Sequence, residues 1–539
     1  MRVGISALLW LVVATAVTTA DESVYSRVDQ LIESAAGTTV AATSDDAEFL
    51  RRIFLDLAGR IPSASEAQAF FSDSSVDKRT ALIDRLLASP EYPRRMRDAW
   101  HVQLMERAGD HPEWSRYLEQ SFSTNKPWNQ LVREVLNPDP DQEATRGAAF
   151  FLTKRLENYG QQPVDLPALT RDVGRLFLGV DLQCAQCHDH LFIQDYKQVD
   201  FQGLHTFLSH TSIRTDLKYP AIAEKVIDKK TEFMSVFIKE PHVTGPRLPF
   251  GTEFEVPAFA KGEEFAVAPD RKINFPGKPK FSPLGILAEQ LPIAANRPFV
   301  RNIVNRLWFQ MFGRGLVHPL DLQHSGNPAS HPAVLDLLAE EFVAHQFDIK
   351  WLLRELALSR AYQRSSVLPA GLEREPLPEK YVVAIEKPLS TEQLLWSVLQ
   401  ATGELPRYQP TSTKEADSKP NPQLEELRKK FVAAFANPPR DPEVEFAPSV
   451  KAALFLSHDA KVLELLKPQN ENLAEQLVAE SDNTKRCEAL FVAVLSRTPS
   501  AEEVQAIDQF LAARTDQRGK AIGQLIWALV SSTEFCVNH

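Results

Sequence analysis

A helix that ends in a Gly-Arg turn near the start of the chain decides what kind of fold this sequence forms. It reads Phe54-Leu55-Asp56-Leu57-Ala58-Gly59-Arg60-Ile61-Pro62-Ser63. Before the glycine, apolar residues recur at helical spacing, as at Phe49 and Ile53, so we expect a helix over 46–60. Ser63 and Glu66 then have the spacing of a capping box, which predicts a second helix directly after the turn. The stretch therefore predicts two helices joined by a short loop.

The same pattern returns near the other end of the chain. There the sequence reads Phe491-Val492-Ala493-Val494-Leu495-Ser496-Arg497-Thr498-Pro499-Ser500, and Glu503 follows as Glu66 does in the first copy. Both copies also end alike, in Leu86-Leu87-Ala88-Ser89-Pro90-Glu91-Tyr92 and Leu529-Val530-Ser531-Ser532-Thr533-Glu534-Phe535. Self-similarity of this kind marks repeated structural units, so we predict two copies of one helical module. The alternative is a chance likeness between amphipathic helices.

Helical periodicity also fills most of the chain between the two copies. Further helices are expected over 77–88, 92–106, 166–180, 196–208, 303–312, 332–345 and 349–357. Between 218 and 283, Pro and Gly become frequent and short alternating runs occur at 233–238, 254–256 and 265–267, which predicts strands. We therefore predict a mostly α, multi-helical, two-part architecture. It has an N-terminal helical domain over 46–217, a small β-containing insertion near 218–283, and a C-terminal helical domain over 284–539.

Composition and charge restrict the possible functions. The 539 residues are 44% hydrophobic, which allows a sizeable core. The net charge of −11 and the pI of about 5.7 argue against a nucleic-acid partner, because binding nucleic acid needs clustered Lys and Arg. The sequence contains no Gly-rich phosphate loop, Gly-x-Ser-x-Gly elbow or His-Glu-x-x-His motif, so it assigns no catalytic residue.

The first twenty residues have the pattern of a secretory signal peptide. Arg2 gives a positive start, an apolar run covers 5–17, and Thr18-Thr19-Ala20 offers small residues for cleavage. An uncleaved anchor is the alternative, but this run is shorter than the roughly twenty apolar residues that span a bilayer. We therefore expect an exported protein, periplasmic or extracellular, with no transmembrane span in the mature chain.

The chemistry of the sequence is concentrated in Leu182-Gln183-Cys184-Ala185-Gln186-Cys187-His188-Asp189-His190. The spacing Cys-x-x-Cys-His is the one used for covalent attachment of haem c. Two thiols form thioethers to the porphyrin, and the imidazole that follows ligates the iron. This pattern makes Cys184 and Cys187 the attachment residues and His188 the iron ligand. The second axial ligand is open, with Met96, Met105, Met234, Met311, His205 and His210 as candidates.

Three other interpretations of this stretch remain open. Cys184 and Cys187 with His205 and His210 approach the spacing of a zinc finger, and His190 offers another zinc ligand. The two cysteines can instead form a small disulfide or remain as thiols with no cofactor, while a catalytic dithiol lacks the usual βαβ context. Elsewhere, Cys487 and Cys536 are candidates for a structural disulfide, because each lies near the end of a predicted helix.

One further polar cluster lies on a predicted helix. It consists of Arg301, Asn302, Asn305 and Arg306. The cluster can bind an anion, but we expect it to join the helix to neighbouring loops through buried hydrogen bonds.

Several of these stretches resemble two families of unknown function. Family 1549 is resembled by Arg51-Arg52-Ile53-Phe54-Leu55-Asp56-Leu57-Ala58-Gly59, by Leu86-Leu87-Ala88-Ser89-Pro90-Glu91-Tyr92, and by Cys184-Ala185-Gln186-Cys187-His188-Asp189-His190. Family 1553 is resembled by Phe299-Val300-Arg301-Asn302-Ile303-Val304-Asn305-Arg306-Leu307-Trp308, Ser359-Arg360-Ala361-Tyr362-Gln363 and Ser532-Thr533-Glu534-Phe535-Cys536-Val537-Asn538-His539. The resemblance implies an exported, planctomycete-type protein that pairs the two domains, and it implies no activity. The family motif usually continues as His-Pro-Phe, whereas this chain has His190-Leu191-Phe192.

Two hypotheses of function follow. The first is a mono-haem c-type protein that carries electrons, or performs a haem-dependent oxidation, with a redox partner in the cell envelope. The second is a non-catalytic scaffold or binding protein of the envelope, in which the Cys/His cluster is a structural zinc or disulfide site. Repeated helical pairs commonly offer binding surfaces, which favours the second hypothesis.

Overall fold

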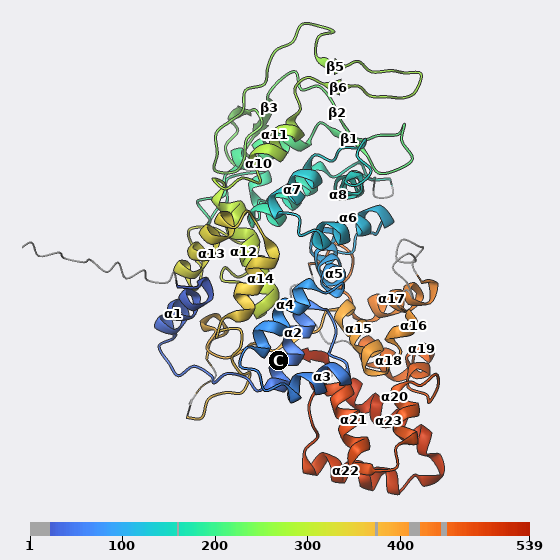
Figure 1. The fold of residues 1–539 in the computed structure, drawn as a ribbon. Helices are drawn as coiled ribbons and strands as arrows, with labels where there is room; N and C mark the ends of the chain where they lie inside the picture. The colour runs from blue at the N-terminus through green and yellow to red at the C-terminus, as the bar shows by residue number, and fades with distance from the viewer. Residues whose placement is uncertain (1–21, 159–160, 372–373, 375, 409–420, 443–449) are drawn as a thin grey trace, which may run out of the picture.

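The computed structural model of the protein describes residues 22–158, 161–371, 374, 376–408, 421–442 and 450–539. Within these residues helices form most of the regular structure and the sheets are small two-stranded pairs, so the predicted mostly α fold is confirmed. Figure 1 shows three of the strand pairs at one end of the molecule and the last long helices at the opposite end. The predicted signal peptide, residues 1–20, lies outside the described residues.

The chain before the first strand forms a series of short helices. In order they are α1 (Val24–Ala36), α2 (Asp46–Leu57), α3 (Ala64–Ser72), α4 (Lys78–Ala88), α5 (Glu91–Met105), α6 (Pro112–Ser123), α7 (Trp128–Leu136), the 3₁₀ turn η1 (Arg146–Ala149), α8 (Phe150–Arg155), α9 (Leu166–Val173), the π-helical turn η2 (Gly174–Leu178), the 3₁₀ turn η3 (Cys184–Gln186) and α10 (Gln198–Leu208). Capping fixes where several begin: the Asp45 side chain accepts from Glu48 N, and Ser63 and Glu66 form the predicted capping box.

Three antiparallel strand pairs follow. β1 (Thr211–Ile213) pairs with β2 (Ile222–Glu224), β3 (Thr231–Met234) with β4 (Pro241–Thr244), and β5 (Phe265–Val267) with β6 (Lys278–Pro279). The strand expected over 233–238 ends at Met234, because Val236 N donates to Cys187 O instead of to a neighbouring strand. The run expected over 254–256 forms no strand. The nearest pairing is a single bridge between Arg247 and Glu253.

Helices resume after β6. They are α11 (Pro283–Gln290), α12 (Arg297–Phe312), α13 (Pro332–Ala344), α14 (Ile349–Leu358), η4 (Pro378–Lys380), α15 (Thr391–Ala401), α16 (Leu405–Tyr408), α17 (Pro422–Phe435), α18 (Val450–His458), α19 (Ala460–Leu465), α20 (Leu473–Ala479), α21 (Asn483–Leu495), α22 (Ala501–Ala512), η5 (Thr515–Gln517), α23 (Arg518–Val530) and α24 (Thr533–Cys536). Two short strands, β7 (Lys387–Pro388) and β8 (Val537–Asn538), pair antiparallel, so the last described residues return to the middle of the fold.

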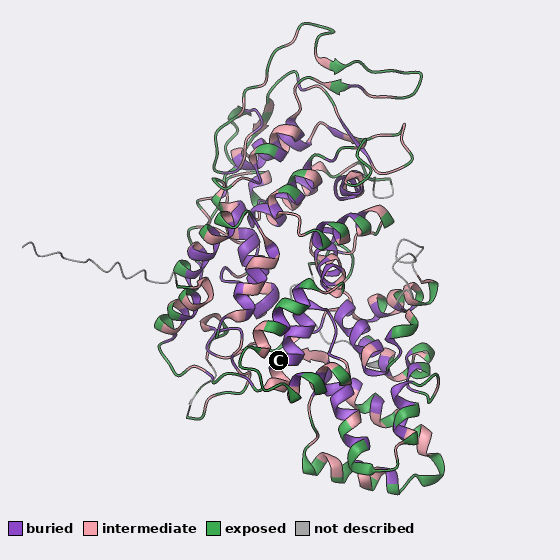
Figure 2. Ribbon diagram, viewed as in Figure 1, coloured by how far each residue is buried: buried purple, intermediate pink, exposed green. Residues whose placement is uncertain are grey.

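The buried side chains form two hydrophobic cores. The first core combines the helices up to α10 with α11–α14, and the second combines α15–α24 with Leu55 and Ile61. The packing therefore divides the chain near residue 389, whereas the boundary expected at 283/284 falls inside the first core. Figure 2 shows the buried residues along the helices at the centre of the molecule and mostly exposed residues in the loop that carries β5 and β6.

The two copies of the predicted module share one arrangement. In the first copy, the Arg60 guanidinium bonds Glu66 at 2.8 Å and Glu91 at 2.6 Å. In the second copy, Arg497 bonds Glu503 at 2.8 Å and Glu534 at 2.6 Å. Each arginine also stacks on the phenylalanine six residues before it, with centroid distances of 5.3 and 5.0 Å. A fork of hydrogen bonds thus closes the same helix-turn-helix unit twice.

The two modules also pack against each other. Arg51 on α2 is fully buried, and its guanidinium donates to Phe535 O at 2.7 Å and to Glu534 O at 3.3 Å. The neighbouring Arg52 donates to His539 O at 3.1 Å. Carbonyl groups at the end of the second module therefore satisfy cations of the first module.

Candidate functional site

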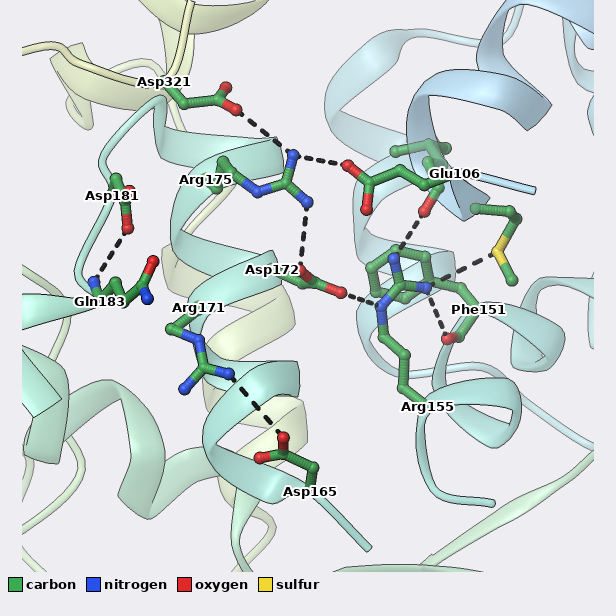
Figure 3. Close-up of polar contacts among 12 residues, drawn as sticks. Glu106, Phe151, Arg155, Asp165, Arg171, Asp172, Arg175, Asp181, Gln183 and Asp321 are labelled. Carbon is green, nitrogen blue, oxygen red and sulfur yellow. Dashed lines mark hydrogen bonds and ion pairs between the residues drawn. The ribbon is translucent and has the colours of Figure 1, made fainter. Parts of the chain in front are cut away.

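The Cys-x-x-Cys-His segment follows a helix that ends sharply. α9 and η2 end at Gly179, whose φ of +69° is in the left-handed region that glycine adopts without strain. The Asp181 carboxylate then accepts from Gln183 N at 2.9 Å and starts the 3₁₀ turn η3 (Figure 3). Cys184 begins this turn and Cys187 directly follows it, and Cys187 N donates to Cys184 O at 3.3 Å.

Side chains on both flanking helices hold η3 in place. From α9, Arg171 donates to Gln186 Oε1 at 2.5 Å, and from α10 Gln202 donates to Gln186 O at 3.1 Å. Ala185 is fully buried, whereas Cys184 and Cys187 are exposed free thiols. The turn therefore presents both cysteine side chains to solvent on a fixed backbone.

An ion-pair network is centred on Arg175 of η2, the helical turn that precedes this segment, and it connects η2 to the second half of the chain (Figure 3). Arg175 on η2 bonds Glu106 at 2.7 Å, Asp172 at 3.1 Å and Asp321 at 3.3 Å, and Arg155 bonds Asp172 at 2.7 Å. Burial raises the pKa of Glu106 despite Arg175. Burial also tends to raise the pKa of Asp172. The positive charges and hydrogen bonds of Arg155 and Arg175 outweigh burial there, so the pKa of Asp172 is lowered. The network fixes η2, from which the cysteine turn projects.

His188 and His190 have opposite tautomers. His188 Nδ1 lies 2.6 Å from Asp189 O, and because a carbonyl oxygen only accepts, Nδ1 must donate. Its Nε2 then carries a lone pair that is available to a metal. His190 Nδ1 instead accepts from Phe192 N at 3.2 Å and Ile193 N at 2.9 Å, so its proton is on Nε2. In this structure His188 is the residue of the pair that is ready to act as a ligand.

Exposed apolar side chains flank the two thiols and His188. We call them the apolar flank: Leu191, Phe192, Met234, Val236, Phe237 and Ile238. Phe192 is 89% exposed and Phe237 is 64% exposed. The flank is attached to the motif directly, because Val236 N donates to Cys187 O at 3.1 Å and the Phe237 ring lies 4.6 Å from the His188 ring. Exposed apolar patches are often places where a ligand or a partner protein binds.

The turn after β3 was not identified as part of this site from the sequence. It reaches the motif from about fifty residues further along the chain. The sequence feature that could have indicated this contact is the apolar run over 233–238, which predicts a strand. The residues after Met234 have no strand partner, and Val236 contacts the cysteine turn instead.

The possible axial ligands differ in burial. Met96, Met105 and Met311 are buried in the first core, where packing holds their thioethers. Met234 is 51% exposed and begins the turn that contacts Cys187 and His188. Its backbone oxygen accepts from Gln198 Nε2 at 3.2 Å, which fixes the turn to α10. Of the four methionines considered, Met234 is therefore the one with an exposed side chain, and it begins a turn whose other residues contact the motif.

The residues considered for zinc have other partners. His205 Nδ1 lies 3.0 Å from the Thr170 hydroxyl and its ring stacks on Phe201, while His210 Nδ1 lies 3.0 Å from the Ser209 hydroxyl. Burial lowers the pKa of both imidazoles. In the described part of the chain, no three His, Cys, Asp or Glu residues gather into a group that could hold a metal ion. Cys184, Cys187, His190, His205 and His210 thus form no zinc site in this structure.

The structure does not contain the disulfide considered between Cys487 and Cys536. Both are free thiols. Cys487 is fully buried in the second core, and Cys536 Sγ points to Val530 O at 3.9 Å. The two side chains therefore have separate surroundings.

The polar cluster on α12 joins this helix to a neighbouring loop, as expected, and also to η2 and α13. Asn302 donates to Leu176 O at 2.8 Å, and Asn305 exchanges two hydrogen bonds with Val317 at 2.8 and 2.9 Å. Arg306 forms an ion pair with Asp321 and Arg301 forms one with Asp336. These contacts anchor the π-helical turn η2, and through it the cysteine turn, to the second half of the chain.

Comparisons with known protein families agree with the resemblance of the N-terminal half to family 1549 and of the C-terminal half to family 1553. Residues 27–213 match the family described as "Protein of unknown function (DUF1549)", and residues 285–511 match the family described as "Protein of unknown function (DUF1553)". No curated protein and no solved structure matches the chain at a significant level. Within the residues described, none of the helices has both the length and the apolar character needed to cross a membrane.

Proposed function

This chain belongs to the proteins that carry the DUF1549 and DUF1553 families in tandem, and we propose that it is an exported, mono-haem c-type redox protein. In this proposal Cys184 and Cys187 form the two thioether bonds and His188 Nε2 ligates the iron. When bound, haem supplies one-electron redox chemistry. The protein then acts in electron transfer or haem-dependent oxidation with a partner in the cell envelope.

The observation that carries the proposal is the state of His188. Its Nδ1 donates to Asp189 O, which leaves the lone pair on Nε2, as an iron ligand requires. The exposed thiols on the η3 turn and the apolar flank support the same conclusion. A porphyrin is a flat apolar group, and covering it with exposed Phe and Val side chains removes apolar surface from water.

The decisive test is covalent attachment. The full chain is expressed with its first twenty residues in a host competent for cytochrome c maturation. It is then analysed by a haem-stained denaturing gel and a pyridine haemochrome spectrum. We expect one haem per chain, lost in Cys184→Ser and in Cys187→Ser and retained in the matched control Cys536→Ser. A folded but colourless wild-type protein would overturn the proposal. N-terminal sequencing of the same sample is expected to begin at Asp21, in line with export.

Met234 is our choice for the second axial ligand. Of the four methionines considered, it is the one with an exposed side chain, and it begins a turn whose other residues contact the motif. We expect Met234→Leu to keep the covalent haem but to change its absorption spectrum and to allow carbon monoxide to bind. Met311→Leu, a similar change in the first core, is the control and should leave the spectrum unchanged. Identical spectra for wild type and Met234→Leu would exclude Met234.

A second candidate function rests on the same apolar flank. A partner protein of the envelope can cover these side chains as well as a porphyrin can, which corresponds to a non-catalytic binding or scaffold role. This role predicts a colourless protein whose partner is lost on Phe237→Ser but not on Cys184→Ser. The attachment experiment therefore separates the two functions.

A further inference from the structure

A cavity lies away from the cysteine turn, where distant parts of the chain meet. It has a volume of about 220 Å³ and is bordered by α5, the end of α12, the segment 386–393 and β8. Its lining includes Asp56, Arg95, Gln310, Lys387, Glu392 and Asn538. Both families contribute residues to it, so the cavity exists only in the folded pair.

Three of the four carboxylates that line the cavity have cationic partners, and the fourth, Glu386, is exposed. Asp56 accepts from Lys387 Nζ at 2.8 and 2.9 Å, and also from Tyr362 and Asn538. Glu392 bonds Arg107 in a two-pronged pair at 2.8 and 3.0 Å. Asp98 pairs with Arg97 at 2.8 Å. Their negative charges are therefore compensated within the protein.

Lys387 has no donor left for a ligand. Besides Asp56, its ammonium group donates to Gln310 O at 3.0 Å and to Met311 O at 2.7 Å, two carbonyls in the last turn of α12. An ammonium group has three N–H bonds, and these acceptors use all of them. Lys387 is thus a structural residue that closes the end of the helix.

Arg95 is the exception among these cations. Its side chain is 8% exposed, and its one hydrogen bond to the described residues is from Nε to Asp56 O at 3.4 Å. The two terminal nitrogens, with four N–H bonds, form none. Gly59 leaves room for this side chain, because a Cβ at Gly59 would lie 2.8 Å from Arg95 Cδ. These nitrogens are not closed off from solvent, so they are open to the cavity, where the oxygens of a bound anion can accept from them.

Two acceptors on lining residues have no donor either, but they are closed to the cavity. Asn538 Oδ1 and Gln310 Oε1 are buried, shielded from solvent and without a hydrogen-bond partner. The orientation of the Asn538 amide is fixed, because its Nδ2 donates to the Asp56 carboxylate at 2.9 Å and a carboxylate only accepts. Neither oxygen is therefore open to a ligand, which leaves Arg95 as the polar group that can bind one.

We propose that this cavity binds a small carboxylate, whose oxygens accept from the terminal N–H groups of Arg95. The volume of about 220 Å³ is below the roughly 300–1,000 Å³ of pockets for drug-sized ligands, so it suits a ligand of about one sugar unit. This inference does not depend on haem, because none of its residues belongs to the cysteine turn or the apolar flank.

Isothermal titration calorimetry on the full chain tests the proposal, with D-glucuronate as the probe and D-glucose as its neutral counterpart. We expect glucuronate to bind and glucose to bind at least about tenfold more weakly, since glucose lacks the charged acceptor. Arg95→Gln should weaken glucuronate by about tenfold to a hundredfold. Arg116→Gln, an exposed arginine on α6, is the matched control and should bind as wild type does.

A second variant keeps the test decisive if Arg95→Gln fails to fold. Val102 lines the cavity from α5, and Val102→Trp fills it without removing a charge, so glucuronate binding should be lost. Three results would each overturn the proposal: no binding of glucuronate to the wild type, equal binding of glucose, or unchanged binding in the folded variants.

Discussion

Two arginines, Arg60 and Arg497, form the same two-carboxylate fork in different surroundings. The Arg60 side chain is 7% exposed and that of Arg497 is 30% exposed. A charged hydrogen bond contributes more when its partners are shielded from water, and a buried carboxylate that loses its partner is strongly destabilising. The repeat therefore provides a comparison in which the geometry is nearly constant and burial varies.

We predict that Arg60→Gln lowers the free energy of unfolding by about 2–4 kcal/mol and that Arg497→Gln lowers it by about 1 kcal/mol. The larger effect arises because Glu66 and Glu91 are left without their cation in a less exposed site. Urea unfolding of the two variants beside wild type measures both values. Equal losses in the two copies would show that burial does not set the strength of the fork.

The four cysteines should differ in reactivity when no haem is attached. Cys184 and Cys187 are exposed, whereas burial raises the pKa of the Cys487 and Cys536 thiols and so lowers their thiolate fraction. We predict that a maleimide labels two thiols rapidly in the native protein and reaches Cys487 only after unfolding. The double variant Cys184→Ser and Cys187→Ser is the control. A rapid phase that survives in it would contradict the structure.

Among the elements, the C-terminal module has the clearest pH dependence. Hydrogen bonds from Arg497 hold the pKa of Glu503 at about 2, compared with 4.5 for an unperturbed glutamate. Because the folded-state pKa is the lower one, the stabilisation is complete above pH 4.5 and is lost as the pH falls toward 2. The fork should therefore weaken in acid.

We predict that the stability difference between wild type and Arg497→Gln is present at about pH 6 and largely gone at about pH 2.5. Trp527 on α23 is the reporter, since its indole donates to Leu456 O and its fluorescence should follow unfolding of this module. Urea midpoints at the two pH values measure the change. A difference that stays constant between them would exclude Glu503 as the cause.

Elements with strong local signals could be predicted from the sequence. The capping box at Ser63 and Glu66 depends on residues three positions apart, and the apolar spacing of α2, α5 and α9 is also local, so these helices and α3 form close to where we expected. The helix expected over 166–180 continues past α9 as η2 and ends at Gly179. The turn at 235–238 could not be predicted in this way. Its residues alternate like a strand, and only the tertiary bond from Val236 N to Cys187 O shows that they do something else.

At the scale of the whole molecule, the sequence predicted the repeat and the Cys-x-x-Cys-His motif but neither the two cores nor the cavity beside Arg95. Asp56 and Lys387 are adjacent in space and 331 residues apart in the chain. No local pattern links them, because each looks like an ordinary charged surface residue in sequence. The two halves of a buried ion pair are recognisable only after the chain has folded.

The three residues 537–539 should contribute more to stability than such a short segment usually does. They supply β8, the Asn538 amide that bonds Asp56, and the carbonyl that accepts from Arg52. We predict that deleting them lowers the free energy of unfolding by about 2–4 kcal/mol, since Arg52 and Asp56 each lose a buried partner. Asn538→Ala, measured in parallel by urea unfolding, should account for only part of the loss. A truncated chain as stable as wild type would show that β8 is dispensable.

The contact of Arg51 with the second module imposes an order on the making of the protein. On a ribosome, α2 emerges early, but the carbonyls of Glu534 and Phe535 that receive its guanidinium are synthesised 483 and 484 residues later. The first module can close its own fork with Arg60, Glu66 and Glu91 before that. The Arg51 guanidinium must remain hydrated until residues 534 and 535 have been made, so the two modules can pack against each other only late in synthesis.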